Sequence, residues 1–389
     1  MEPAPSSNSR GLAVALVTAA TFTDILAYSI AVPVLPHLSR QFGASPTVIG
    51  LLFASFGVTL FAVSVPMGAY SDRIGRKFPL VGGLLALAAA SVLFAFAPDM
   101  TWLFIARLVQ GGADAVTWVV GFALIADLYA SDERGRVMGL VMSGSTFGFM
   151  IGPTLGGWLY ETGGIRLPYV FIAALSMIIA LGIALLEIPS KSKAHEPLPL
   201  STILRVPAVA TCAIAVVVGA GTIAMLEPVL SMFLNSAIGL GPARVGLVFG
   251  GGAVVAAVLH PVFGHIADRV GGRQLTLWGL AAIGATLPIL SQSWNFVSAV
   301  GLYVIGALAI ATMITPSLTY MAAATASAGS PSFGVAYGIY NVAWAVGLLI
   351  GPAMGGFLYE RLGLPVLSFI WAPAVVLIAL VLSRVDNSS

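Results

Sequence analysis

Four ionisable side chains lie inside apolar stretches of this sequence, where a charge is costly. Asp24, Arg107, Asp114 and Glu227 each stand in a run long and apolar enough to cross a membrane. An ionisable group at membrane depth usually faces a cavity or a partner, and it often marks the path of an ion or substrate. Arginine keeps its proton at physiological pH, so only the acids can carry a proton or balance a cationic substrate. We therefore expect proton or cation chemistry from these residues.

Asp24 and Glu227 are the first candidates for that chemistry. A carboxyl that titrates near neutrality could exchange a proton for a cation at either position. Asp24 can equally be a permanent partner of Arg107, and Glu227 a packing carboxyl held by neighbouring hydroxyls. Asp114 follows Arg107 by seven residues, two helical turns along the same face. We expect Asp24, Glu227, Arg107 and Asp114 to form the proton-coupling set.

Aromatic and amide side chains near these acids complete a candidate substrate site. Tyr28 is four residues from Asp24, and Tyr340, Asn341 and Trp344 occupy positions i, i+1 and i+4 of one helical pattern. An aromatic face can hold an organic cation. The candidate substrate-binding residues are Asp24, Glu227, Tyr28, Asn341, Tyr340 and Trp344.

Other chemistry is poorly represented. His260, His265 and Asp268 are spaced like metal ligands, but the last two belong to a repeated loop motif, so we expect no metal and no cofactor. The single cysteine, Cys212, lies in an apolar stretch and is expected to be a small packed hydrophobe. No nucleophile–base set suggests an enzyme, and no basic run suggests a nucleic-acid partner.

The composition requires lipid as the main solvent. Of 389 residues, 59% are apolar and only 8% are charged, whereas a soluble domain carries about a quarter charged residues. A helix that crosses the hydrocarbon needs about 20 apolar residues, and breaks at Gly, Pro and charge clusters divide the chain. We predict an all-α membrane protein of twelve spans, at residues 11-37, 47-70, 78-97, 101-129, 135-160, 168-188, 207-234, 243-268, 273-291, 295-321, 332-358 and 365-384.

Loop charges predict the orientation. With the N-terminus inside, the cytoplasmic segments hold twelve Lys and Arg residues and the opposite loops hold four: Arg40, Arg166, Arg244 and Arg361. Positive charge concentrates on the cytoplasmic side, so we expect both termini in the cytoplasm. Segment 189-206 is the most polar connection and is predicted to link two six-helix bundles, 1-188 and 207-389. The first apolar stretch contains Asp24 and is expected to be a retained helix rather than a cleaved signal.

Two motifs occur twice at nearly the same spacing. Gly68-Ala-Tyr-Ser-Asp-Arg-Ile-Gly-Arg-Lys77 returns 196 residues later as Gly264-His-Ile-Ala-Asp-Arg-Val-Gly-Gly-Arg273. Gly148-Phe-Met-Ile-Gly-Pro-Thr-Leu-Gly-Gly157 returns after 199 residues as Gly347-Leu-Leu-Ile-Gly-Pro-Ala-Met-Gly-Gly356. The repetition indicates a duplicated six-helix unit, as in many secondary transporters. Glycines permit close helix packing and proline bends the helix, so we expect Gly152, Pro153, Gly351 and Pro352 to flex during gating. Asp72, beside Arg73, can meet a helix N-terminus or a basic side chain of the adjacent bundle, so we expect these two residues to hold the cytoplasmic side shut.

These motifs resemble the major facilitator superfamily over essentially the whole chain. The first loop motif is similar to the signature of that family, and Arg107-Leu-Val-Gln-Gly-Gly112 resembles the fourth-helix signature of its proton-coupled members. The motif from Gly148 to Gly157 resembles the antiporter signature of drug/proton antiporters. The resemblance implies the major facilitator fold, alternating access and a monomer.

A narrower resemblance points to bacterial relatives of the vesicular monoamine transporters. It is carried by Asp24 with Val32-Pro-Val-Leu-Pro36, by Asp132-Glu-Arg-Gly-Arg-Val-Met-Gly139, and by Ala224-Met-Leu-Glu-Pro228. In that branch the acid of the last motif belongs to the substrate site, which implies the same for Glu227. The chain departs from the branch at three positions, with an apolar residue near Ile314 and Asn341 in place of acids, and Phe56 in place of a lysine.

The predicted function is a proton-coupled antiporter that exports lipophilic or aromatic cationic amines. Its expected partners are protons, a small organic cation and the lipid of a bacterial plasma membrane. The alternative is a proton-coupled symporter for a sugar or organic anion, which would favour more midplane cations or amides than this chain offers. A membrane-embedded enzyme or a receptor is the third and weakest reading.

Overall fold

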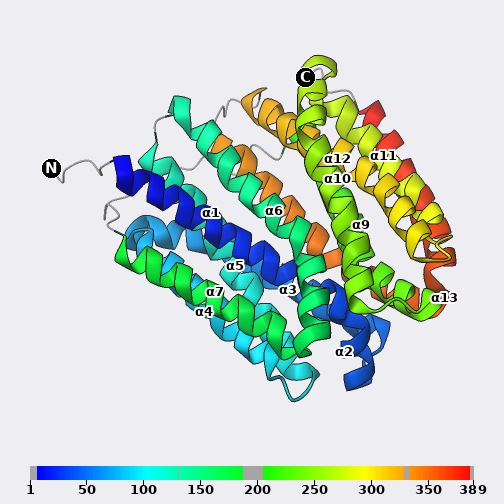
Figure 1. The fold of residues 1–389 in the computed structure, drawn as a ribbon. Helices are drawn as coiled ribbons and strands as arrows, with labels where there is room; N and C mark the ends of the chain where they lie inside the picture. The colour runs from blue at the N-terminus through cyan, green and yellow to red at the C-terminus, as the bar shows by residue number, and fades with distance from the viewer. Residues whose placement is uncertain (1–6, 130, 187–204, 328–332, 386–389) are drawn as a thin grey trace. The chain divides into compact units, whose positions relative to one another are not determined.

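The computed structural model describes residues 7–129, 131–186, 205–327 and 333–385, and every regular element within these ranges is a helix. The first half of the chain forms α1 (Ser7–Ser29), the 3-10 helix η1 (Val32–Val34), α2 (Leu35–Phe42), α3 (Pro46–Ile74), α4 (Lys77–Ala95), α5 (Met100–Leu128), α6 (Ser131–Gly163) and α7 (Arg166–Leu185). The second half forms α9 (Pro207–Ile238), α10 (Pro242–Val270), α11 (Gly272–Leu290), α12 (Phe296–Ser327) and α13 (Phe333–Arg384) (Figure 1).

Ten of these helical stretches are long and apolar enough to cross a membrane. One of them, Gly338–Arg384, lies in α13, which is 52 residues long and broken at Gly363, where φ is 68°. Because of this break, α13 supplies two of the predicted spans, 332-358 and 365-384. The 19-residue α11 begins with the polar pair Arg273 and Gln274 and supplies the remaining one. The twelve predicted spans are thus accounted for.

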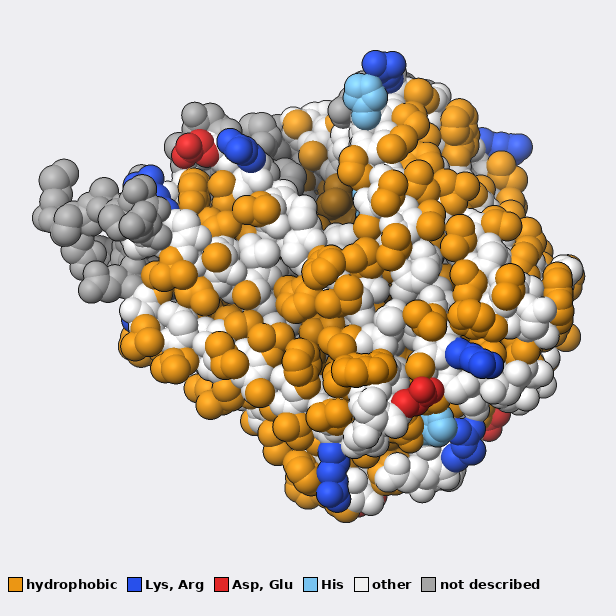
Figure 2. Space-filling view, in the orientation of Figure 1, with side chains coloured by type: hydrophobic (Ala, Val, Ile, Leu, Met, Phe, Trp, Pro, Cys, Tyr) orange, Lys and Arg blue, Asp and Glu red, His pale blue; other side chains and the backbone are white. Residues whose placement is uncertain are grey.

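The surface of the protein is as apolar as a lipid environment requires. Figure 2 shows hydrophobic side chains over most of the face in view, with few charged side chains. Large residues such as Phe78, Leu185 and Trp278 expose 76%, 75% and 62% of their area. Such exposure over many neighbouring residues marks a surface that meets another apolar phase, so the chain is a multi-pass membrane protein.

The described residues fall into two compact units. The first unit comprises the chain up to Val34 and the stretch from Ser55 to the end of α7. The second unit comprises Leu35–Ala54 and the helices α9 to α13. The unit boundary therefore falls inside α3. The predicted bundle limits, 1-188 and 207-389, stay a prediction, and most of the predicted linker 189-206 lies outside the described residues.

In the first unit, α6 packs against α1 through a row of glycines. A Cβ atom built on Gly148 would lie 2.6 Å from the carbonyl oxygen of Phe22, and one on Gly152 would collide with the Ser29 hydroxyl. Side chains larger than hydrogen would push the two helices apart. Small residues spaced by four are how helices approach closely in lipid, and α4 lies beside α7 in the same unit (Figure 1).

In the second unit, α13 packs against α9 through the second copy of the same motif. A Cβ atom on Gly347 would lie 2.7 Å from the backbone nitrogen of Gly221, and one on Gly351 would collide with the Gly221 carbonyl oxygen. The repeated glycines therefore serve the same packing purpose in both units. They bring α6 against α1 in the first unit and α13 against α9 in the second. Pro153 and Pro352 lie inside these helices, next to the close contacts.

Candidate functional site

The first unit holds a buried cluster of charge between α1 and α5. Asp24 from α1 exposes 2% of its area, and Arg107 and Asp114 from α5 expose 0% and 5%. Asp24 and Asp114 lie close enough for their charges to repel. The structure therefore brings three of the four residues of the predicted proton-coupling set into one unit, and at least the two acids into one cluster.

Asp114 has a hydrogen-bond donor that the sequence did not suggest. The Trp118 indole Nε1 donates to Asp114 Oδ1 at 3.0 Å. The Trp118 ring in turn stacks on Phe122, with 5.5 Å between centroids and planes 7° apart. Because indole N–H can only donate, this arrangement fixes the Asp114 carboxyl as an acceptor.

Asp24 is buried without a comparable donor. Among the described residues, none donates a hydrogen bond of ordinary geometry to either carboxylate oxygen of Asp24. Thr117, on the same stretch of α5 as Asp114, approaches Asp24, but its hydroxyl donates to the carbonyl oxygen of Ala113 at 3.2 Å. The two acids of the cluster therefore differ in their hydrogen bonding.

Arg107 is surrounded by aromatic rings. Its guanidinium carbon lies 5.6 Å from the ring centroid of Tyr28 and 5.6 Å from that of Phe94. The Phe94 ring stacks on Tyr169 at 4.1 Å. Cation–π contact stabilises a desolvated guanidinium more than an exposed one, so these rings help to hold the charge in the bundle.

The residues after Arg107 bring α5 close to α3. A Cβ atom on Gly111 would collide with the Phe56 carbonyl oxygen, and the Thr59 hydroxyl donates to the Leu108 carbonyl oxygen at 2.6 Å. Phe56 packs on Tyr28 with 5.0 Å between centroids. The predicted cavity residue Tyr28 thus lies between Phe56 and Arg107, and it is buried.

Glu227 occupies the interior of the second unit. It exposes 4% of its area and precedes Pro228, which lies inside α9. It lies within electrostatic range of the Tyr303 hydroxyl of α12, and the Tyr303 ring meets Phe249 edge-on at 4.9 Å. Sequence reasoning missed Tyr303 and Phe249, because single aromatics in apolar helices look like ordinary core residues.

The three predicted substrate contacts on α13 are Tyr340, Asn341 and Trp344, and they lie far along the helices from Glu227. Tyr340 stacks on Trp344 at 6.1 Å, accepts a hydrogen bond from the Ser317 hydroxyl at 3.3 Å, and packs in a buried cluster with Cys212. Glu227 follows Cys212 by 15 residues in the same helix, or about 22 Å along its axis. Tyr340 is therefore not beside Glu227, and Asn341 on the next position is half-buried.

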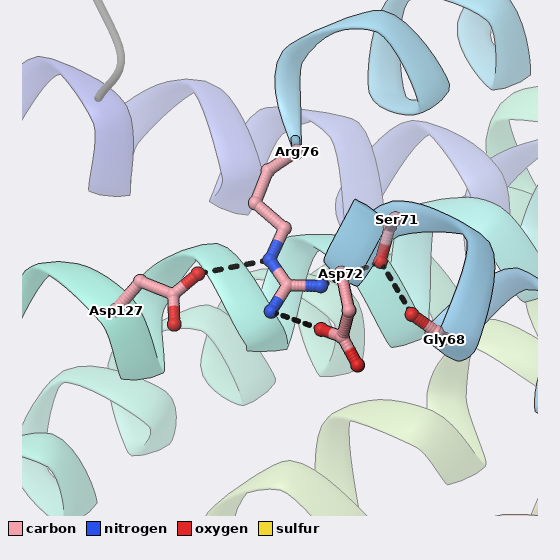
Figure 3. Close-up of polar contacts among 5 residues, drawn as sticks. All are labelled: Gly68, Ser71, Asp72, Arg76 and Asp127. Carbon is pink, nitrogen blue, oxygen red and sulfur yellow. Dashed lines mark hydrogen bonds and ion pairs between the residues drawn. The ribbon is translucent and has the colours of Figure 1, made fainter. Parts of the chain in front are cut away.

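Among the predicted gating residues, Asp72 joins a network centred on Arg76 (Figure 3). Arg76 contacts Asp72 at 2.6 Å and Asp127 of α5 at 2.8 Å, and it donates to the Ser71 hydroxyl at 2.6 Å. Arg73, by contrast, is exposed. The arginine that ties the end of α3 to α5 is therefore Arg76, although both arginines belong to the repeated motif.

The second copy of the loop motif uses its arginine differently. Gly272 takes the place of Arg76 in the repeat, and Arg273 donates to the carbonyl oxygens of Ser383 at 3.1 Å and Val385 at 2.7 Å. A cation at the C-terminus of a helix satisfies its last carbonyl groups. The first copy thus forms an ion-pair network, while the second caps the end of α13.

One of the two histidines of α10, His260, lies beside a hydroxyl of another helix. His260 Nδ1 lies 2.8 Å from the Thr315 hydroxyl of α12. Within the described ranges, no group of three or more His, Cys, Asp or Glu side chains is arranged to hold a metal ion.

Comparison with known proteins decides the family. The Major Facilitator Superfamily matches residues 17–226 and 212–388. The chain belongs to the major facilitator superfamily. The predicted family and fold class, with twelve helices in two six-helix bundles, are thereby confirmed, and the chain is a membrane transporter rather than an enzyme.

Several known transporters are similar to this major facilitator chain. The human chromaffin granule amine transporter is 28% identical over 84% of this chain, and a probable vesicular acetylcholine transporter-B from Danio rerio is 28% identical over 95%. The human MFS-type transporter SLC18B1 is 26% identical over 95%. The alignments cover 64%, 79% and 84% of those three proteins, respectively. The predicted resemblance to vesicular monoamine transporters is therefore confirmed.

A solved structure supports the fold. A bacterial homolog of the human lysosomal transporter Spinster, crystallised in an inward-facing and occupied conformation, superposes with a TM-score of 0.84. It shares 15% of its sequence with this chain, and the match covers 98% of both chains. At this identity the likeness concerns the fold alone.

Proposed function

We propose that this major facilitator protein is a proton-coupled antiporter that exports lipophilic or aromatic cationic amines, either monoamine-like compounds or a range of drugs, by alternating access. In this proposal it works as a monomer in a bacterial plasma membrane, with both termini in the cytoplasm. Protons that enter down their gradient neutralise buried acids, and the cation is released outside.

The burial of three acids carries the proposal. Asp24, Asp114 and Glu227 are each at least 95% buried, and acids at such depth in transporters usually serve ion or substrate movement. A buried carboxylate is tolerable when a cation or a proton neutralises it. Exchange of the one for the other is the chemistry of a cation/proton antiporter.

The names of the relatives agree with this substrate class. Two of them are transporters of an amine and of acetylcholine, and both kinds of substrate carry a positive charge. The aromatic rings near the acids, Tyr28 in the first unit and Tyr303 in the second, suit such cations, because a ring face attracts them.

Each predicted residue has a proposed role. Asp24 and Glu227 bind the cation and the proton, while Arg107 and Asp114 set the charge balance around Asp24. Tyr28 contributes aromatic surface for the substrate near Asp24, while Tyr340, Asn341 and Trp344 contribute aromatic and amide surface at another level of the substrate path. Gating is assigned to Asp72, Arg73, Gly152, Pro153, Gly351 and Pro352.

A symporter for a sugar or organic anion is the competing function. An anion would need an accessible cationic group at membrane depth. Arg107 exposes 0% of its area and lies against the rings of Tyr28 and Phe94, so it is poorly placed to receive an anion.

Proteoliposomes with an acidic lumen test the proposal. We expect an aromatic monoamine to accumulate inside them, because the outward proton gradient drives exchange. Glu227→Gln should reduce accumulation to the level without a gradient, since a neutral amide carries neither a proton nor a counter-charge. Glu161→Gln, at an exposed acid near the end of α6, is the matched control and should transport normally. Absence of gradient-driven uptake across a panel of amines and cationic dyes would favour a neutral or anionic substrate.

A further inference from the structure

Away from the α3–α4 loop that Arg76 stabilises, the described residues of the first unit bury two carboxyl groups, Asp24 and Asp114, and one guanidinium, that of Arg107. Their charges do not balance. With Asp24 and Asp114 both ionised, the set that includes Arg107 has a net charge of −1. Burial of uncompensated charge is expensive, and such groups usually change protonation state instead. Two carboxyls that share a site rarely both ionise.

The groups that face Asp24 are few. α5 contributes Thr117 and Asp114, which lie near Asp24, and the same helix carries Arg107. α7 contributes the phenol of Tyr169, which lies within electrostatic range of Arg107. α6 faces α1 with glycines, and α4 contributes the ring of Phe94. Tyr28 is on α1 itself. Arg107 therefore supplies the positive charge that these elements bring to the cluster.

We infer that Asp24 and Asp114 share a single proton and that Trp118 determines which of them holds it. A hydrogen bond to an ionised acceptor is stronger than one to a neutral acceptor. The Trp118 N–H donates to Asp114 at 3.0 Å, which favours the anion there. In the described part of the chain Asp24 has only the Thr117 hydroxyl nearby, and that hydroxyl donates to the Ala113 carbonyl oxygen at 3.2 Å, so the proton resides on Asp24. Trp118 is thus a positioning residue.

The exchange step follows if the proposed function holds. A monovalent cation arrives at protonated Asp24, the O–H bond of the carboxyl breaks, and the proton leaves to water. The carboxylate of Asp24 then balances the cation, and the net charge of the cluster and its ligand stays the same. One cation is therefore exchanged for one proton at this unit. The exchange rests on the proposed function, whereas the shared proton does not.

Infrared spectroscopy of the whole protein in lipid nanodiscs tests the shared proton without any substrate. At neutral pH the wild type should show the C=O stretching band of a buried protonated carboxyl. Asp24→Asn should lose it because the anionic Asp114 remains. Asp114→Asn should also lose it, because Asp24 can then ionise with Arg107 as the balancing charge of the set. All variants are made in the Glu227→Gln background, so that the buried acid of the second unit contributes no band. Glu161→Gln, at an exposed acid, is the control and should retain the band.

Trp118→Phe tests the positioning role. It removes the N–H but keeps a ring against Phe122, so the proton should spread over both acids. The band should broaden or shift while its intensity stays. Asp24→Glu should restore a band that Asp24→Asn lacks. A wild type without the band, or a full band in either Asp→Asn variant, would overturn the shared proton. An unchanged band in Trp118→Phe would overturn the role of Trp118.

Binding of tetraphenylphosphonium, which has no exchangeable proton of its own, tests the exchange separately. A pH-indicator dye should report one proton released for each cation bound by the wild type, and none for Asp24→Asn. Release that persists in Asp24→Asn would overturn the exchange at Asp24. If the wild type does not bind this cation, the proposed function loses its lipophilic substrates, and the infrared result still decides the shared proton.

Discussion

The charges of two buried arginines in the first unit are stabilised in different ways, by ion pairs at Arg76 and by aromatic rings at Arg107. Arg76, at the end of α3, has oxygen atoms of Asp72, Asp127 and Ser71 within 2.8 Å. Arg107, at membrane depth, lies against aromatic rings and in the helix that carries Asp114. The first arrangement holds two helices together, while the second leaves acids whose charge can change.

Substitution of Arg76 should destabilise the protein, because it removes the shared partner of two carboxylates. We expect Arg76→Ala to lower the free energy of unfolding by about 1–3 kcal/mol. Thermal unfolding of the purified protein in detergent measures the effect. Arg73→Ala is the matched control, since it removes the same charge from the same loop at an exposed position. Equal effects of the two substitutions would show that charge alone, and not the network of Arg76, stabilises this loop.

The sequence revealed the acids but not their hydrogen bonds. Asp24, Asp114 and Glu227 were predictable because an ionisable residue in an apolar span is rare and seldom accidental. Trp118 was not, because an aromatic four residues from an acid in a long apolar helix is usually a core residue. Arg73 and Arg76 are equivalent in the motif, and only the turn between α3 and α4 shows which of them is buried.

At the scale of the helices, the repeated glycines have one structural purpose in both units. The motif predicted close packing, and the structure adds the partner, which is α1 for α6 and α9 for α13. The partner could not be read from the motif, because the residues it meets, such as Phe22 and Gly221, contribute backbone atoms. Backbone contacts leave little pattern in the sequence of the second helix.

Gly351→Ala should separate α13 from α9. The added methyl group would meet the Gly221 carbonyl oxygen, and a backbone atom cannot move aside as a flexible side chain can. Such overpacking costs about 1–3 kcal/mol, so we expect a lower unfolding temperature and reduced transport. Gly338→Ala in the same helix has nothing within 4 Å of the new atom and should behave as wild type. A wild-type unfolding temperature for Gly351→Ala would mean that the helices are not packed in this way.

At the scale of the whole molecule, hydropathy predicts the number of spans, whereas the composition of the compact units depends on contacts that hydropathy does not describe. The number of consecutive apolar residues can be counted in each segment, so the twelve spans follow from the sequence. The association of Leu35–Ala54 with the second unit does not. It depends on contacts such as that between Gly50 and Gly356, where a Cβ atom on Gly50 would lie 3.0 Å from the Cα atom of Gly356, and on the Glu360 carboxylate that accepts the Thr47 N–H at 2.9 Å.

The predicted orientation can be tested with the thiol of the chain. The native Cys212 exposes 0% of its area, so a membrane-impermeant maleimide should not label the wild type. Gln41 and Arg269 are both exposed. Gln41 follows the first predicted span and Arg269 the eighth, so the predicted topology places them on opposite sides of the membrane. Because positive charge concentrates in the cytoplasm, Gln41→Cys should be labelled on intact cells and Arg269→Cys only after the membrane is opened. The reverse pattern would invert the topology, and protons would then have to enter from the side on which the loop of Arg76 lies.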